Sequence, residues 1–190
     1  GKYGIGILSK EKPKNFYYLP LPGREEERTF LVVEFDNYYF CCTHLSLTPE
    51  DQLASIPILR KEAAKAQKPL FIAGDLNATP ESATIKELEN DFQILTNSSW
   101  NTFPADKPDS CIDYIAAYKT SDTPFSLFSN AVWYETVASD HRPVVADIRF
   151  RVKKEDIFRT NPYLQNPDKD AITVMWQTNV TAYSWVEYGT

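Results

Sequence analysis

The chain contains few of the residues on which several classes of protein depend. Among its 190 residues are two histidines, three cysteines, one methionine and six glycines. Two of the cysteines, Cys41 and Cys42, are adjacent, and no Cys-x-x-Cys or Cys/His spacing occurs, so neither a disulfide framework nor a zinc site is expected. No apolar run approaches the roughly 20 residues of a membrane-spanning helix. We therefore expect free thiols and no membrane partner.

Basic residues are too few and too scattered for a protein that grips nucleic acid by charge. The chain has 20 Lys and Arg against 26 Asp and Glu, a net charge of −6, and no basic cluster longer than Lys153-Lys154. Proteins that bind nucleic acid normally carry a basic stripe, so nucleic acid is not expected as a partner. What the chain does contain is 43% hydrophobic and 14% aromatic residues, which predicts a packed globular core.

The apolar residues form short runs that alternate with helical patterns. Two helices are expected, over residues 48–66 and 79–90, each opened by a threonine followed by proline; Pro57 should kink or interrupt the first. Runs rich in β-branched and aromatic residues predict strands at 3–8, 30–35, 38–43, 70–73, 112–117, 131–134 and 144–150. This alternation predicts a layered α/β domain.

The chain changes character after its last apolar strand. Residues 1–152 form the predicted α/β domain, residues 153–160 a charged linker, and residues 161–190 the start of an all-β module with alternating strands at 171–176 and 183–188. Within the first domain, residues 96–110 are polar and proline-containing, which predicts a long loop. Loops of that length are often functional.

Side chains suited to proton transfer and metal binding stand where predicted strands meet loops, the place where ligand sites gather in layered α/β proteins. Histidine has the unperturbed pKa closest to neutrality, so a chain with only two histidines, both at such positions, suggests acid–base chemistry. Taken singly, each histidine could equally be structural, and Gly-Asp-Leu-Asn is also a turn pattern. The residues concerned are His44, Asp75, Asn77, Asp113, Asp140 and His141.

Four motifs in a fixed order carry a resemblance to a known family. They are Thr43-His44-Leu45, Gly74-Asp75-Leu76-Asn77, Ile112-Asp113-Tyr114-Ile115 and Ser139-Asp140-His141-Arg142-Pro143. In this order they resemble the C-terminal part of the endonuclease/exonuclease/phosphatase domain, over roughly residues 1–150. The resemblance implies a four-layered α/β sandwich with two sheets between helices, here partial and followed by a C-terminal all-β fragment. It also implies hydrolysis of phosphodiesters or phosphomonoesters with Mg²⁺ or Mn²⁺.

The resemblance assigns the central roles to one histidine and two aspartates. It makes His141 the general base that activates water, and Asp113 the carboxylate that accepts its other ring proton and fixes the tautomer. It places Asp140 near the metal, where a carboxylate suits a hard cation.

Further residues follow from the same resemblance. Asp75 and Asn77 would hold the nucleophile and a phosphate oxygen, and whether Asp75 is itself the base stays open. His44, as a cation, would hydrogen-bond a phosphoryl oxygen or assist the leaving group. Arg28 is a candidate for phosphate binding, although a surface arginine is the simpler interpretation. Trp100, in the long loop, is a candidate for substrate binding.

One part of the family pattern has no match here. The family's metal-binding glutamate lies upstream of the matched region, and residues 25–27, all glutamate, are interpreted as a solvated turn. Activity is therefore expected of a longer parent protein. Two alternatives stay open: a catalytically silent binding or adaptor module that retains the fold, and a nuclease of the DNA-repair type, for which the acidic composition gives no support.

The C-terminal segment carries a second resemblance. Residues 161–165, 171–176 and 185–189 are similar to the opening of the fibronectin-like domain that precedes the catalytic domain of purple acid phosphatases. The resemblance implies a parent protein that joins two phosphoesterases. Such a protein suits small phosphate esters outside the cytoplasm, so a secreted or periplasmic location is favoured. The oligomeric state cannot be inferred from the sequence.

Overall fold

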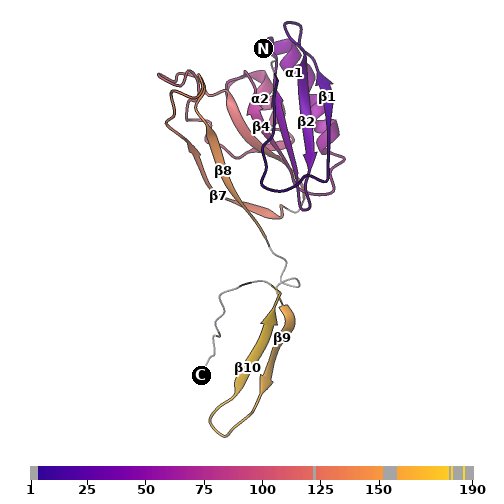
Figure 1. Ribbon diagram of the computed structural model, residues 1–190, viewed down its shortest axis with the longest axis vertical. Helices are drawn as coiled ribbons and strands as arrows, with labels where there is room; N and C mark the ends of the chain where they lie inside the picture. Colours follow the sequence, from indigo (N-terminus) through magenta and orange to yellow (C-terminus); the bar gives the residue numbers. More distant parts are fainter. Residues whose placement is uncertain (1–3, 122, 152–157, 180, 182–185, 187–190) are drawn as a thin grey trace. The chain divides into compact units, whose positions relative to one another are not determined.

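A computed structural model describes residues 4–121, 123–151, 158–179, 181 and 186 of the chain (Figure 1). The chain divides into two compact units, Gly1–Arg149 and Phe150–Thr190. Each unit has its own strands, and the site residues predicted from the sequence all belong to the first. Within the described residues, neither helix is long and apolar enough to cross a bilayer.

The first unit is built on a six-stranded mixed sheet. The strands lie in the order β1-β2-β3-β4-β6-β5, and only β3 and β4 run parallel. Adjacent antiparallel strands need only short turns, whereas the parallel pair needs a crossover, which the first helix supplies. The bounds are β1 (Asn15–Leu21), β2 (Arg28–Glu34), β3 (Tyr39–His44), β4 (Leu70–Asp75), β5 (Phe92–Ile94) and β6 (Asp113–Tyr118).

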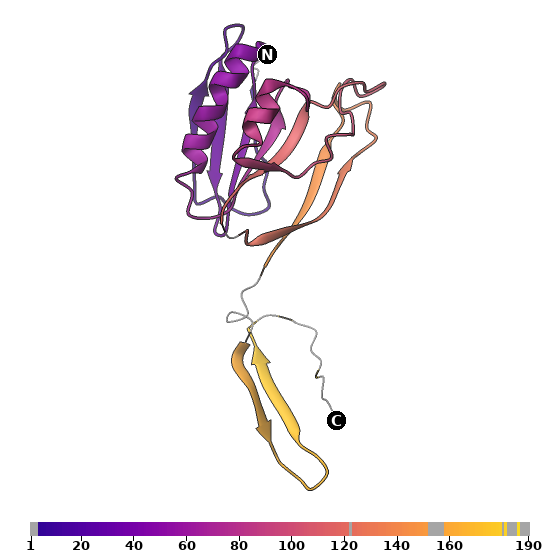
Figure 2. The ribbon, with the colours of Figure 1, turned by 180° about the vertical axis from the view of Figure 1, so that it is seen from behind.

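Two helices, α1 (Pro49–Ala63) and α2 (Ala83–Leu88), cover one face of this sheet (Figure 2). The α1 helix begins with proline at its first turn, where the missing N–H costs nothing, and with two acidic residues that suit the positive end of the helix dipole. The α2 helix is capped by Ser82, whose Oγ accepts a hydrogen bond from the Ile85 N–H at 3.2 Å.

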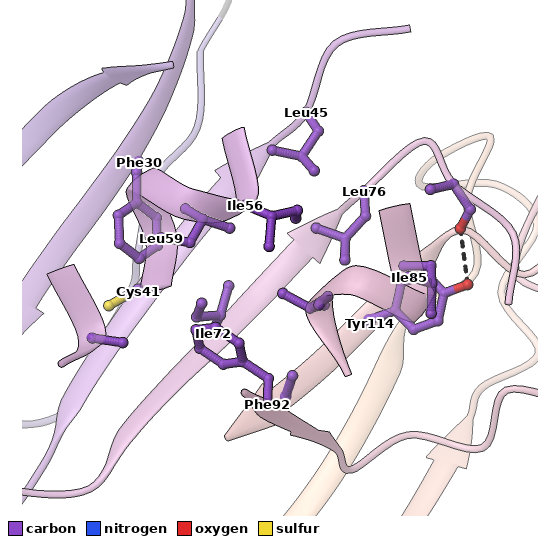
Figure 3. Close-up of a cluster of buried hydrophobic side chains, with 14 of the residues drawn as sticks. Phe30, Cys41, Leu45, Ile56, Leu59, Ile72, Leu76, Ile85, Phe92 and Tyr114 are labelled. Atoms are coloured by element: carbon purple, nitrogen blue, oxygen red, sulfur yellow. Dashed lines mark hydrogen bonds between the residues drawn. The ribbon is translucent and has the colours of Figure 1, made fainter. Parts of the chain in front are cut away.

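The main core lies between the helices and the sheet (Figure 3). Fully buried side chains from the sheet, such as Phe30 and Ile72, face Ile56 and Leu59 from α1. Each such side chain contributes about 1.5–3 kcal/mol by leaving water. Tyr114 joins this cluster with its hydroxyl satisfied, because the hydroxyl lies 2.9 Å from the carbonyl oxygens of Ala78 and Cys111.

A separate pair of strands packs against the opposite face. These strands, β7 (Phe125–Val132) and β8 (Val144–Phe150), form a two-stranded sheet. Phe71 and Phe125 make an edge-to-face contact in a second apolar cluster, at 5.0 Å between ring centroids. Helices, mixed sheet and second sheet thus confirm the predicted α/β layered fold in partial form.

The second unit contains a β-hairpin. Its strands, β9 (Phe158–Gln165) and β10 (Thr173–Thr178), pair antiparallel, which confirms a C-terminal all-β fragment. Residues 158–160, expected in the linker, lie in β9. The predicted strand at 171–176 overlaps β10, and the strand predicted at 183–188 lies outside the described residues, apart from Val186, which has no regular structure.

Several predicted strands are wrong. Gly4–Leu8 has no strand pairing although its apolar residues alternate, because the sheet edge beside β2 is taken by β1, which was not predicted. Pro20 lies within β1, and a proline normally argues against a strand. It is tolerated here because β1 is at the edge of the sheet. The strand predicted at 131–134 occurs earlier, as β7, and the short β5 was missed.

The helix predictions needed smaller corrections. The α1 helix continues through Pro57 without interruption, with the proline on its exposed side. The second helix starts at Ser82 instead of Thr79, because the serine side chain caps it. The segment 96–110 contains only one isolated bridge, between Phe103 and Ser110, so the prediction of a long loop is confirmed.

Candidate active site

The strand register places three of the predicted site residues in one row across the sheet. His44 ends β3 and is paired with Asp75 at the end of β4, and Asp75 is paired with Asp113 at the start of β6. Paired residues on neighbouring strands point to the same face and lie side by side. His44 Nε2 accordingly lies 3.4 Å from Asp75 Oδ2. Residues distant in sequence therefore meet because each ends or begins a strand at the same edge.

His141 comes to this row from the segment before β8. Its Nδ1 lies 2.9 Å from Asp113 Oδ2, and its Nε2 lies 3.8 Å from Asp75 Oδ2. A carboxylate that accepts the Nδ1 proton leaves Nε2 of the neutral ring free to accept another. The side chain is a quarter exposed, so the ring is accessible as well as oriented.

The backbone around His141 is joined to the long loop by two hydrogen bonds. The Arg142 N–H donates to the Thr102 carbonyl, and the Ala105 N–H donates to the Asp140 carbonyl, both at 2.7 Å. Between these points the Phe103 ring packs on the His141 ring, at 4.7 Å between centroids. The loop predicted to shape substrate choice therefore also supports the catalytic candidate.

Asn77 is held in a backbone conformation that closes the turn after β4. Its φ of 49° is left-handed, a region asparagine enters more readily than most residues. Its N–H donates to Asp75 Oδ1 at 2.8 Å, and its side-chain amide donates to the Leu45 carbonyl at 2.9 Å. The Asn77 side chain therefore ties the loop after β4 to the loop after β3.

A buried glutamine on α1, missed in the sequence, supports the same two loops. Gln52 is 3% exposed, and its side-chain amide donates to the carbonyls of Ser46 and Asn77, each at 2.9 Å. Its own oxygen accepts from the Thr84 hydroxyl at 3.1 Å. The sequence indicates that Gln52 is buried, because it lies four residues before the apolar Ile56 and so on the same face of α1.

The carboxylates shift the acid–base properties of the cluster. Burial alone lowers the pKa of His141, but the hydrogen bond and charge of Asp113, with the charges of Asp75 and Asp140, outweigh it and raise the pKa. Burial raises the pKa of Asp75, and the neighbouring Asp113 charge adds to this, while the Asn77 N–H opposes it. The carboxylates around His141 therefore make it more basic than a free imidazole, as a proton acceptor requires.

His44 is shifted in the opposite direction. Burial lowers its pKa, and the positive charges of Arg28 and His141 lower it further, against the opposing charge of Asp75. This direction favours an uncharged ring, unlike the cation expected from the resemblance. Asp75, which was not predicted as its partner, supplies the nearby carboxylate.

Arg28 is buried, which the sequence did not predict. Its side chain is 5% exposed, with Nη2 3.4 Å from a carboxylate oxygen of Glu26. Among the described residues, Nε and Nη1 have no hydrogen-bond partner although both are buried. A buried guanidinium with unused donors is costly without an acceptor, and its charge reaches His44.

The glutamates before Arg28 are occupied by other contacts. Glu25 accepts hydrogen bonds from the hydroxyls of Ser46, at 2.8 Å, and Thr48, and Glu26 pairs with Arg28. The Glu25 contacts join the turn before β2 to the start of α1. The segment is therefore a structural connection as well as a solvated turn.

The other predicted residues lie outside the central row. Asp140 is exposed, with its carboxylate 3.4 Å from the Ser139 hydroxyl, and it contributes charge to His141. Trp100 lines a hollow together with Asn101 and Arg142. The residues predicted to be catalytic do not line this hollow.

Three of the clustered residues could hold a metal ion. Asp75, Asp113 and His141 each offer a ligand atom, and these atoms lie within 4.8 Å of one another. Mg²⁺ is commonly bound by one or two carboxylates, with waters or substrate oxygens completing its shell. Two aspartates at this spacing fit that requirement, and carboxylate oxygens suit Mn²⁺ as well as Mg²⁺. The predicted ligand Asp140 is not in this group.

A family model described as the Endonuclease/Exonuclease/phosphatase family matches residues 1–145. The chain belongs to this family. Members of the endonuclease/exonuclease/phosphatase family are hydrolases acting on phosphate esters, and its enzymes typically depend on a divalent metal. The clustered aspartates and histidine are the part of this chain that such chemistry would use.

Solved structures support the fold. The endonuclease/exonuclease/phosphatase of Bacteroides vulgatus is 15% identical, with a TM-score of 0.60, covering 74% of this chain and 66% of its own. A mannosyl-6-phosphatase of Bacteroides thetaiotaomicron is 14% identical, with a TM-score of 0.61 and coverage of 73% and 67%. The human Nocturnin catalytic domain is 18% identical, with a TM-score of 0.56 and coverage of 73% and 60%. None of the curated proteins matches significantly.

The chain spans about two thirds of the length of these structures or less. At such low identity the likeness concerns the fold and leaves the substrate open.

Proposed function

We propose that the protein hydrolyses a phosphate ester by direct attack of water, with His141 as the base and Asp113 as the residue that orients it. The observation that carries this proposal is the 2.9 Å contact between His141 Nδ1 and Asp113 Oδ2, which leaves Nε2 facing the cluster. Water adds to phosphorus, its proton passes to Nε2, and the phosphorus–oxygen bond to the alcohol breaks. The leaving alcohol oxygen takes up a proton, and inorganic phosphate or a monoester remains.

Two side chains are suited to hold the phosphoryl group, and a third positions the loop beside them. Arg28 has two buried donors without acceptors, and phosphate oxygens are acceptors that suit a guanidinium. His44 lies beside Asp75 in the same row, which makes it a second candidate to contact a phosphoryl oxygen. Asn77 fixes the loop from which its neighbours reach the substrate. Such a site works mainly by positioning and by stabilising charge.

A divalent cation, Mg²⁺ or Mn²⁺, would be held by Asp75 and Asp113 and would stabilise negative charge on the phosphoryl oxygens. Without a cation the two aspartates, paired directly across neighbouring strands, repel each other. Burial is the main cause of the raised pKa of Asp75, and this repulsion by Asp113 adds to it.

We propose a small phosphate ester as the substrate, in preference to nucleic acid. The chain carries a net charge of −6 and lacks a basic stripe, so it has little to neutralise a long polyanion. Relatives by fold include a protein named as a mannosyl-6-phosphatase, which acts on a small ester by its name. The fibronectin-like character proposed for the C-terminal unit, supported by its antiparallel hairpin, agrees with a protein that works on soluble esters outside the cytoplasm.

The test is hydrolysis of p-nitrophenyl phosphate and bis-p-nitrophenyl phosphate by the full-length protein, with Mg²⁺ or Mn²⁺ and with chelator. We expect turnover that chelator removes, and a loss of about 10³-fold or more in His141→Ala, because the base is gone. The melting temperature of the variant should match that of the parent. Undiminished turnover in a folded His141→Ala protein would overturn the proposal, as would the absence of any metal-dependent hydrolysis.

A further inference from the structure

A hollow beside the catalytic centre has a volume of about 450 Å³, which is within the usual range for small-molecule sites. Trp100 and Asn101 from the long loop, Val132 at the end of β7 and Arg142 line it, together with Pro108. We propose that this hollow binds the organic group of the phosphate ester, and that this group is a polyhydroxylated ring, that is, a sugar. The inference rests on the proposed function, because it assigns the leaving group to a place next to that site.

The residues that line the hollow are neighbours in sequence of residues at the catalytic centre. Arg142 directly follows His141, and successive Cα atoms are about 3.8 Å apart. On the opposite wall, Trp100 and Asn101 lead into Thr102 and Phe103. The Arg142 N–H donates to the Thr102 carbonyl at 2.7 Å, and the Phe103 ring packs on His141. The same two segments therefore support His141 and line the hollow, and on this ground the proposal directs the leaving group of the ester to the hollow.

The lining has the two kinds of surface that a sugar requires. The Trp100 side chain is 44% exposed and offers a flat apolar face, on which the C–H face of a pyranose can lie. The Asn101 amide donates one N–H to the Pro108 carbonyl at 3.4 Å and keeps its oxygen and second N–H for hydroxyl groups. A sugar ring is apolar on its faces and polar at its rim, so both needs are met in one place.

Arg142 is held in position while keeping donors available. Its Nε donates to the Ala105 carbonyl at 2.7 Å, and its guanidinium lies 4.9 Å from the centre of the Tyr134 ring. Among the described residues, neither terminal nitrogen has a hydrogen-bond partner. A fixed guanidinium with free donors is preorganised to bind ring hydroxyls or an ester oxygen.

A nucleobase suits this hollow less well. Bases in single-stranded nucleic-acid sites are typically stacked on aromatic platforms within a positively charged groove. Here one indole faces aliphatic residues, Pro108 and Val132, and the surrounding chain is acidic. A base remains the alternative that the experiment has to separate from a sugar.

Binding can be measured without any turnover. The chain has four tryptophans, so the ¹⁵N-labelled full-length protein gives a resolvable set of indole N–H resonances, and Trp100→Phe identifies the one from Trp100. We expect glucose 1-phosphate to shift the Trp100 resonance, uncharged methyl glucoside to shift it at higher concentration, and inorganic phosphate to leave it unchanged. No shift with either sugar would overturn the proposal. A shift with adenosine but not with methyl glucoside would also overturn it, in favour of a base.

Kinetics provide the second measurement, with Trp133→Ala as the matched control, since Trp133 is an exposed indole outside the hollow. We expect Trp100→Ala to raise the KM for glucose 1-phosphate about tenfold, the loss of one stacking contact, and to change the KM for methyl phosphate far less, because that ester has no ring to stack. Equal effects on both substrates would contradict a sugar site. If no ester is hydrolysed but the Trp100 resonance shifts, only the proposed function fails. If esters are hydrolysed without a shift, only this inference fails.

Discussion

The two sides of the active site are held in place by different means. On the side of α1, the loops that follow His44 and Asp75 are joined by side-chain hydrogen bonds, and the buried amide of Gln52 makes two of them. On the side of the long loop, the segment of His141 is supported mainly by hydrogen bonds between backbone groups, with one side-chain bond from Arg142 Nε to the Ala105 carbonyl, and by one aromatic contact.

This difference decides how each side responds to substitution. A buried side-chain network loses several hydrogen bonds when one member is removed, and the groups left behind remain buried and unsatisfied. Backbone hydrogen bonds survive most substitutions. Substitutions on the α1 side should therefore lower mainly the stability of the protein. Substitutions on the His141 side should lower mainly the catalytic rate, because the Asp113 carboxylate and the Phe103 ring contact the imidazole.

The largest effect is expected from Asp113→Asn, which removes the carboxylate that contacts the imidazole of His141. An amide cannot accept the Nδ1 proton as a carboxylate does, so the wrong tautomer is favoured. We expect kcat to fall about 10²–10⁴-fold, with the melting temperature little changed. Steady-state kinetics of the full-length protein on p-nitrophenyl phosphate measure this.

The pH profile separates orientation from a structural effect. Asp113 raises the pKa of His141, and a base is active only above its pKa, so the acidic limb of kcat/KM should move to lower pH in Asp113→Asn. Asp147→Asn is the control, because Asp147 is exposed on β8. An unchanged rate and limb in Asp113→Asn would show that Asp113 does not orient the base.

The next effect is expected from Gln52→Met, which breaks the α1 side. Methionine has a similar volume but leaves the Ser46 and Asn77 carbonyls and the Thr84 hydroxyl without their partner. We expect a loss of about 2–4 kcal/mol in the free energy of unfolding and a fall in kcat of about tenfold as the loops lose definition. Chemical denaturation with parallel kinetics measures both.

Gln93→Met is the matched control for that variant, because Gln93 is exposed on β5. We expect its stability to stay within about 0.5 kcal/mol of the parent. Equal stability of the two variants would contradict a supporting role for Gln52.

The sequence predicted the α/β class and the strands that carry the site, because their apolar runs are long and bounded by turn residues. It could not predict strand pairing. The direct alignment of His44 with Asp75, and of Asp75 with Asp113, depends on β6 running antiparallel to β4, and no local pattern encodes that partner. Proton-transfer candidates were therefore identifiable individually, while their distances were not.

Burial was the other property that the sequence predicted poorly. Arg28 was interpreted as a surface residue because it follows three glutamates, yet it is buried where β2 begins. Glutamine is common on exposed helix faces, so Gln52 does not stand out in the sequence, although its spacing from Ile56 marks the buried face. In both cases the polar group is buried because distant segments surround it, which is a tertiary property.

The smallest effect is expected from Phe103→Leu, which tests the aromatic contact on the His141 side. Leucine keeps an apolar contact but removes the ring that packs at 4.7 Å on the imidazole, while the backbone hydrogen bonds of the loop to Arg142 and Asp140 remain. An aromatic pair contributes about 0.5–1.5 kcal/mol beyond its buried area. We therefore expect kcat to fall a few-fold with KM unchanged, measured beside Phe128→Leu, an exposed phenylalanine on β7. A loss as large as that of Asp113→Asn would mean that the ring, and not the carboxylate, holds His141, and the contrast between the two sides would then have to be drawn differently.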